Sequence, residues 1–281
     1  MWWAERPEQG SLRAIIQAHS RKCILVRGIA WTGTHLRILN VRFLRGDEQL
    51  ANARSMWQTW PGEIAVEEYL RSSLRTVQNT GIRKVLELLD IYNLGIKSLE
   101  LDFDGRVVDV IHTDGIFKSD TGDSCIAYVN LNTITFLRRA YIWGAPGAPG
   151  AQLSPFNTPM IRLRQKKQRR LTPPDLAEDP YILCVLIALA QKQLEDRDQT
   201  DEPLRVSLLA LPGARASHLY FYTACFPFSF LNKFTEPSLF LECPTVSISY
   251  VKMPLDKPEE FLCHLKGVLL ETDALETEEE S

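Results

Sequence analysis

The chain has 281 residues, 45% of them apolar and 24% charged, which is ordinary globular usage and excludes a chain that is disordered throughout. The formal net charge of −3 excludes a surface that is basic everywhere, so any contact with nucleic acid must be local. The longest run of strongly apolar residues, Ile182–Ala190, is about half the length that spans a bilayer, and we expect no membrane contact.

The six cysteines show no C-x-x-C pair and no dense framework, which is typical of buried thiols in a reducing compartment. The first residues, MWWAERPEQG, lack the apolar core of a signal peptide. These two features predict a cytoplasmic or nuclear protein.

The first predicted element is a short helix over 11–18. Two strands are then expected, KCILVRGIAW and HLRILNVRFL, on either side of the turn Thr32-Gly33-Thr34. In the second of them apolar and polar residues nearly alternate, a pattern typical of a half-buried strand. A helix is expected over EQLANARSMW, and after Pro61-Gly62 apolar residues recur at roughly helical spacing: Ile64, Tyr69, Leu70, Leu74 and Val77. Gly81 is expected to interrupt this pattern before another helix, IRKVLELLDIY.

The clearest local signal is a β-hairpin, because SLELDF and RVVDVI flank Asp104-Gly105, a strong two-residue signature of a type I′ turn. The segment CIAYVNLNTITFL is expected to add one or two further strands. The first part of the chain therefore predicts a strand region, a helical region and an antiparallel meander.

Residues 144–174 show no convincing periodicity and open with a Pro/Gly-rich stretch, so we expect an exposed linker. The linker contains a basic run of six cations: Arg162, Arg164, Lys166, Lys167, Arg169 and Arg170. Three interpretations stay open, namely a solvated loop, a nuclear-import signal and direct contact with a phosphate backbone. Thr172 follows in R-R-L-T-P, which fits a basophilic or proline-directed kinase site.

The second part is predicted to begin with a helix over 181–195, which contains the apolar run. Further elements are the paired strands LRVSLLAL and HLYFYTA, the short helix FSFLNKF, the strand TVSISYV and a final amphipathic helix, PEEFLCHLKGVLL. The predicted fold class is therefore α+β, with antiparallel β-meanders flanked by helices. Its two parts, 11–143 and 175–270, are joined by the basic linker 144–174 and followed by an acidic tail, 271–281.

Carboxylates around the hairpin give one candidate catalytic set, Asp102, Asp109 and Asp114. Clustered oxygens of this kind could hold Mg²⁺ or Mn²⁺ for phosphate chemistry. The alternative is that these acids face water or stabilise turns. The chain has no G-x-G-x-x-G, G-x-x-x-x-G-K-[ST] or G-x-S-x-G motif, and its histidines show no metal-ligand spacing, so we expect no cofactor and no metal.

Two blocks, DVIHTDGIFKSDTGDSCIAYVNL and LTPPDLAEDPYILCVLIALAQKQ, resemble lineage-restricted proteins of filamentous fungi. The resemblance implies no activity and transfers no functional residue.

The sequence thus predicts a non-enzymatic binding or adaptor protein inside the cell, cytoplasmic or nuclear. Its partner is expected to be a protein, with nucleic acid an alternative through the basic linker only. The alternative function is a metal-dependent phosphoesterase or nuclease that uses the hairpin carboxylates.

Overall fold

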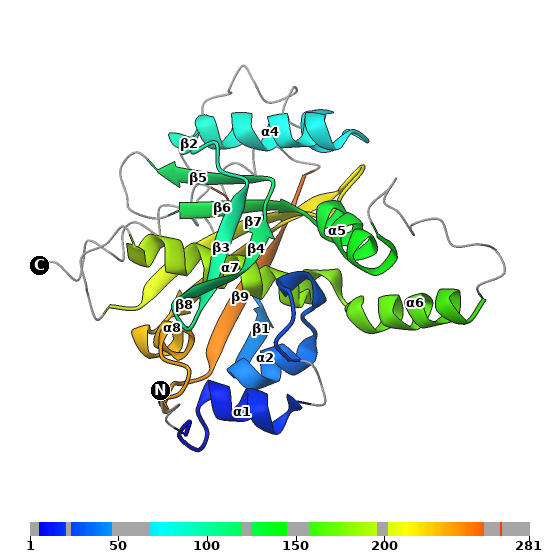
Figure 1. Cartoon of the computed structure of the whole chain (residues 1–281). Helices are drawn as coiled ribbons and strands as arrows, with labels where there is room; N and C mark the ends of the chain where they lie inside the picture. The colour runs from blue at the N-terminus through cyan, green and yellow to red at the C-terminus, as the bar shows by residue number, and fades with distance from the viewer. Residues whose placement is uncertain are drawn as a thin grey trace, which may run out of the picture.

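The computed structural model describes residues 6–20, 24–46, 68–119, 125–144, 158–195, 202–255 and Leu265. It contains a mixed seven-stranded sheet in the order β1-β9-β8-β7-β6-β5-β2 and a separate two-stranded ribbon, β3–β4 (Figure 1). The strands are β1 (Val41–Arg45), β2 (Ile91–Asn93), β3 (Ser98–Phe103), β4 (Arg106–His112), β5 (Gly115–Ser119), β6 (Cys125–Asn130), β7 (Leu204–Leu211), β8 (His218–Phe226) and β9 (Val246–Pro254). The α+β class is confirmed.

The helices lie on both faces of the sheet and at its ends (Figure 1). They are α1 (Leu12–Ala18), α2 (Gly33–Leu39), α4 (Arg75–Glu87), α5 (Leu131–Trp143), α6 (Thr158–Leu171), α7 (Pro180–Glu195) and α8 (Phe228–Thr235), with short 3₁₀ turns η2 (Gly28–Ala30) and η3 (Leu176–Glu178). None of the helices in the described ranges is both long enough and apolar enough to cross a membrane.

Two strand pairs of the sheet are parallel, and each joins segments far apart in the sequence. β6 pairs with β7 across the basic segment, and β1 pairs with β9 across most of the sequence, while the remaining pairings of the sheet are antiparallel. The strands expected in two separate parts therefore share one sheet. The expectation of an irregular linker is wrong for residues 158–171, which form the helix α6. Residues 145–157 of that linker and the expected acidic tail, 271–281, lie outside the described residues.

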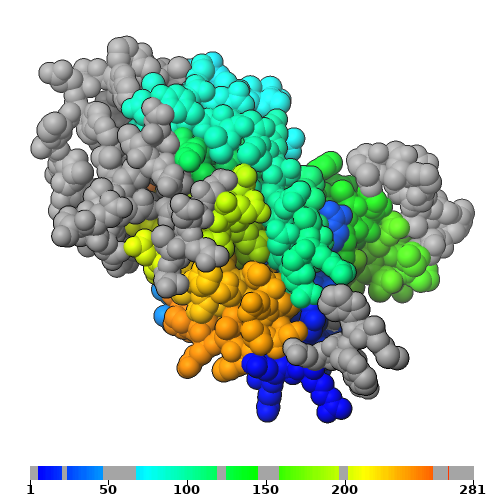
Figure 2. Space-filling model, turned by 60° about the vertical axis from the view of Figure 1, so that its left-hand side comes forward, coloured from blue at the N-terminus to red at the C-terminus, as the bar shows by residue number. Residues whose placement is uncertain are grey.

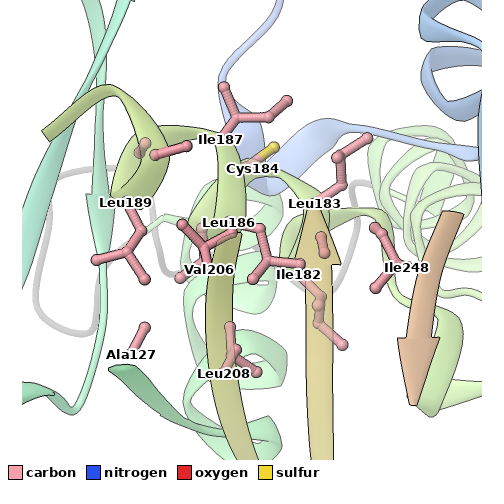
Figure 3. Packing of buried hydrophobic residues seen from close by; sticks show 14 of the residues in the cluster. Ala127, Ile182, Leu183, Cys184, Leu186, Ile187, Leu189, Val206, Leu208 and Ile248 are labelled. Atoms are coloured by element: carbon pink, nitrogen blue, oxygen red, sulfur yellow. The ribbon is translucent and has the colours of Figure 1, made fainter. Parts of the chain in front are cut away.

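The core is built around α7, which lies between the seven-stranded sheet and the β3–β4 ribbon. Ile182, Leu186 and Leu189 face the sheet, where they meet Val206 and Leu208 of β7 (Figure 3). Cys184 lies on the opposite side of the helix, where its thiol donates to Gly28 O at 3.7 Å. A helix covered on both sides needs apolar residues around its whole circumference, which explains the continuous run in the sequence.

The second face of the sheet is covered by α4. Ile82, Val85 and Leu86 are fully buried there against Phe117, Tyr128 and Phe221 of the sheet. Gly81, expected to interrupt a helix, lies inside α4 and is buried. A Cβ at this position would lie 2.7 Å from Tyr69 Cβ, so glycine is required by close approach.

Several expected elements are confirmed. The Asp104-Gly105 turn has φ values of 59° and 68°, as a type I′ turn requires, and joins the antiparallel strands β3 and β4. The helices α1, α7 and α8 and the strands β7, β8 and β9 fall where the sequence predicts them. The expected helices EQLANARSMW and PEEFLCHLKGVLL and the acidic tail lie outside the described residues, apart from Leu265.

Three stretches predicted as strand do not form strands. The described part of KCILVRGIAW, residues 24–31, contains the 3₁₀ turn η2 and no strand. HLRILN forms most of α2, because Thr32 N–H donates to Nδ1 of His35 at 2.9 Å and so caps the helix. Asn40 then ends α2 in the left-handed region, at φ 56°. Similarly, LNTITFL begins α5, because the side chain of Asn130 accepts from Asn132 N–H and caps the helix.

Candidate functional site

The basic run forms α6, a helix of fourteen residues without a carboxylate. Its Arg, Lys, Gln, Leu and Met side chains are good helix formers, and Pro159 is tolerated in the first turn, where its missing N–H has no intrahelical acceptor. Pro173-Pro174 directly after the helix prevent its continuation. The helix lies at the edge of the molecule, beyond α5 (Figure 1).

One side of α6 packs against α5. Gln168 Oε1 accepts from Trp143 Nε1 at 3.0 Å, and Arg164 donates to Trp143 O at 3.3 Å. Leu171 packs with Ile142 of α5 and Ala30 of η2. These contacts fix which side of α6 faces the protein.

Two of the six cations belong to this packed side. The guanidinium carbon of Arg164 lies 5.7 Å from the centre of the Trp143 ring, and Lys167 Nζ lies 4.2 Å from the centre of the Tyr141 ring. Such cation–π contacts are worth about 0.5–1 kcal/mol at exposed sites. Arg164 and Lys167 therefore help to hold α6 on α5.

The other four cations form what we call the α6 cationic face: Arg162, Lys166, Arg169 and Arg170. All four are exposed, and none forms an ion pair with a described residue. Their spacing of four, seven and eight residues places them on one side of a helix. At a rise of 1.5 Å per residue the face extends about 12 Å along the helix axis.

The charge around this face is of one sign. Residues 124–174 contain eight basic residues and no acidic ones, whereas the other 24 basic residues are set against 35 acidic ones, a balance of −11. In Figure 2 the green α5 and α6 surfaces form one flank of the molecule. One of the eight, Arg138, is buried and paired with Asp179, so the exposed positive charge of this segment lies mainly on α6. The rest of the chain is acidic in balance, and the positive potential is therefore expected to be strongest at the α5–α6 flank.

Thr172, the predicted phosphorylation site, is exposed just after α6. Its hydroxyl donates to Gln168 O at 2.9 Å, which caps the last turn. It follows Arg169 and Arg170 by three and two residues. A kinase could reach the hydroxyl, and the modification stays a prediction.

The hairpin carboxylates do not meet at one site. Asp109 accepts from Gly28 N–H at 2.7 Å and from Arg27 Nε at 3.1 Å, and its side chain is only 8% exposed. Asp109 thereby joins β4 to η2, so its role is structural.

Asp114 lies in a different polar network. It accepts from Asn130 N–H at 2.7 Å, from the Thr133 hydroxyl at 2.9 Å and from Asn79 Nδ2 at 3.2 Å. These bonds fix the start of α5 against α4. Its carboxylate oxygens are therefore engaged within the fold.

Asp102, the third of the candidate catalytic carboxylates, has contacts different from those of Asp109 and Asp114. Its backbone N–H and C=O bond to the side chain of Gln191 on α7, each at 3.0 Å. Within the described ranges, no three His, Cys, Asp or Glu side chains gather as a metal site would require. The convergence of carboxylates that a metal-dependent phosphoesterase or nuclease needs is not found for this set.

Asp102 is one of the residues that line an apolar pocket of about 60 Å³ between α1, α2, α8 and the ribbon. His35 also lines it, but both ring nitrogens are occupied: Nδ1 accepts from Thr32 N–H and Nε2 lies 3.0 Å from Ile24 O. Burial lowers the pKa of His35 below its usual value. No local sequence pattern indicates this pocket, because its lining comes from four separate elements and from the segment 24–31.

Comparison of the chain with protein-family models, curated proteins and solved structures finds no match in any of the three. The resemblance to fungal proteins therefore stays a prediction.

Proposed function

We propose that this chain is a non-enzymatic binding or adaptor protein, cytoplasmic or nuclear, whose docking surface for an anionic partner is the α6 cationic face. The observation that carries the proposal is the set of four exposed cations without a described carboxylate partner. Exposed like charges at this spacing repel each other, so the clustering of four cations on one side is not explained by the stability of α6. An anionic partner outside the chain would explain it.

The helical form of the basic run bears on how a partner reads it. A receptor that binds the run as an extended chain would have to unwind α6 and break the Trp143–Gln168 bond. A partner that binds the folded helix incurs no such cost. Docking onto the intact helix is therefore our leading interpretation, ahead of an import signal.

The test compares three forms of the full chain in capture experiments from a native extract. The first is the wild type. The second is the α6 variant, in which Arg162, Lys166, Arg169 and Arg170 are all replaced by glutamine. The third is the charge-matched variant Arg37→Gln, Arg83→Gln, Lys97→Gln, Arg106→Gln, which also removes three arginines and one lysine from exposed positions.

We expect the α6 variant to lose its specific partner and the charge-matched variant to keep it. Circular dichroism should show equal melting temperatures, because exposed charges contribute little to stability. A partner that the α6 variant retains at wild-type level would contradict the proposed surface.

A nuclear role can be tested with the same proteins. If α6 serves nuclear accumulation, a tagged α6 variant should redistribute to the cytoplasm, and the charge-matched variant should not. Equal distribution of both variants would remove the nuclear part of the proposal.

A further inference from the structure

We infer that the partner of the α6 cationic face is the phosphate backbone of double-helical nucleic acid, bound without regard to base sequence. This inference rests on the proposed function and names the class of partner. Three properties of the face support it: its charge spacing, the chemistry of its side chains and the position of its neighbouring aromatic rings.

The first property is spacing. Four cations spread over about 12 Å give one charge for about every 4 Å of helix axis. The phosphates of one strand of a duplex follow each other at about 3.4 Å along its axis. The face therefore matches the linear charge density of a nucleic-acid strand over three or four phosphates.

The second property is side-chain chemistry. Three of the four cations are arginines, whose planar guanidinium can bind phosphate oxygens in a bidentate manner. Leu171 is buried against Ile142 and Ala30, and Ile161 is half-buried, so α6 has no broad apolar face to enter a membrane. Protein interfaces depend on central apolar or aromatic anchors, and α6 exposes two small apolar side chains, Leu163 at 60% and Met160 at 39%.

The third property distinguishes a duplex from a single strand. Single-strand binders stack bases on free aromatic rings. The two rings that contact α6, Tyr141 and Trp143, are already covered by Lys167 and Arg164. Phe136 of α5, 52% exposed, is a single further ring on this flank, fewer than the successive rings on which a single strand stacks. The α6 cationic face itself therefore offers charge without a free ring, which suits the outside of a double helix.

The rest of the molecule limits how much duplex can be bound. The balance of −11 outside residues 124–174 repels a polyanion, so the contact is confined to the α5–α6 flank. Arginine and lysine bind phosphate oxygens whatever the base sequence, and we infer contact with the backbone rather than base readout. The expected binding is weak, independent of sequence and strongly dependent on salt.

The test measures fluorescence anisotropy of a labelled, mixed-sequence DNA duplex with the full chain, over about 50 to 200 mM KCl. Four phosphate contacts predict a slope of about −3.6 in a plot of log K against log salt concentration, or about a 150-fold loss of affinity across this range. The double variant Arg169→Gln, Arg170→Gln should halve the slope to about −1.8. The α6 variant should abolish binding, whereas the charge-matched variant keeps the wild-type slope, and a second duplex of unrelated sequence should bind equally.

Polyglutamate serves as a parallel probe that carries charge without phosphate. If polyglutamate binds through the α6 cationic face and the duplex does not, the nucleic-acid inference is overturned, and the proposed docking surface stands. If neither probe binds at the lowest salt concentration, both are overturned. Equal losses in the α6 variant and the charge-matched variant would overturn the inference too, because net charge rather than this face would then control binding.

Discussion

Arg138 lies at the contact between α5, η2 and the start of α7. Its guanidinium donates to both carboxylate oxygens of Asp179, at 2.8 and 2.9 Å, and to Ile29 O at 3.4 Å. Asp179 also accepts from Tyr181 N–H and so holds the first turn of α7. The two side chains are 5% and 3% exposed, so water cannot replace either partner.

Replacing Arg138 with methionine should lower the free energy of unfolding by about 3–5 kcal/mol, because the Asp179 carboxylate would stay buried without its partner. Urea unfolding at neutral pH measures the change. The partly exposed pair Arg13–Asp104 provides the comparison, and Arg13→Met should cost about 1 kcal/mol or less. Equal losses from the two substitutions would contradict the assigned role of burial.

His35 gives a second residue-scale prediction, which concerns pH. Burial lowers its pKa in the folded state below 6.5, so the unfolded chain binds the proton more readily. The contribution of neutral His35 is fully present above pH 6.5 and is lost as pH falls from there toward the lowered folded pKa. The difference in unfolding free energy between the wild type and His35→Gln should therefore shrink from about pH 7.5 to about pH 5.5. A constant difference would show that His35 does not titrate as expected.

At the scale of elements, α4 depends on a glycine for its packing. Alanine normally stabilises a helix interior by about 0.5–1 kcal/mol relative to glycine. At Gly81 the added Cβ would lie 2.7 Å from Tyr69 Cβ and 3.1 Å from Leu70 Cδ2, so the usual sign should reverse.

We expect Gly81→Ala to destabilise the protein by about 1–3 kcal/mol, as overpacking does. Gly33→Ala, in the first turn of α2, is the control, because a Cβ there has no neighbour within 4 Å. It should leave stability unchanged or raise it by up to about 1 kcal/mol. Thermal unfolding of both variants checks the prediction, and a stabilised Gly81→Ala protein would contradict the described packing of α4.

For α6, the corresponding prediction concerns Thr172. Thr172→Glu places a negative charge close to Arg169 and Arg170 and should weaken binding to an anionic partner, as phosphorylation would more strongly. The melting temperature should change little, because Thr172 is exposed. A Thr172→Gln protein controls for the lost hydroxyl. Unchanged binding by Thr172→Glu would place the partner away from the end of α6.

Local signals predicted the elements that local contacts stabilise. Asp104-Gly105 identified the hairpin, and the apolar run of α7 identified a helix. The strand predicted over HLRILN was wrong because the capping interaction of Thr32 with His35 outweighs a short alternation of apolar residues. The basic run was visible as composition, but the packing of Arg164 and Lys167 was not, since their rings lie more than twenty residues earlier in the chain. Pairings such as β6 with β7 leave no local signal at all.

At the scale of the whole molecule, the shared sheet changes what proteolysis should release. Trypsin cleavage within Arg162–Arg170 would sever the chain between β6 and β7. Because these strands pair along Ile126–Asn130 and Ser207–Leu211, and α7 is covered by β3, the two pieces should remain associated. Size-exclusion chromatography of the nicked protein should give one peak, and denaturing electrophoresis two bands. Separation of the pieces under native conditions would favour two independent parts.

The pairing of β1 with β9 has a consequence for biosynthesis. Val41 lies opposite Val246, so this edge of the sheet cannot close until 205 further residues have been added. At a ribosomal rate of about 5–20 residues per second, the wait is about 10–40 s. During that time Val41 and Phe43 lack the partner strand that covers them in the finished fold. A nascent chain arrested before β9 should therefore associate with chaperones, and one arrested after β9 has left the ribosomal tunnel should be released from them.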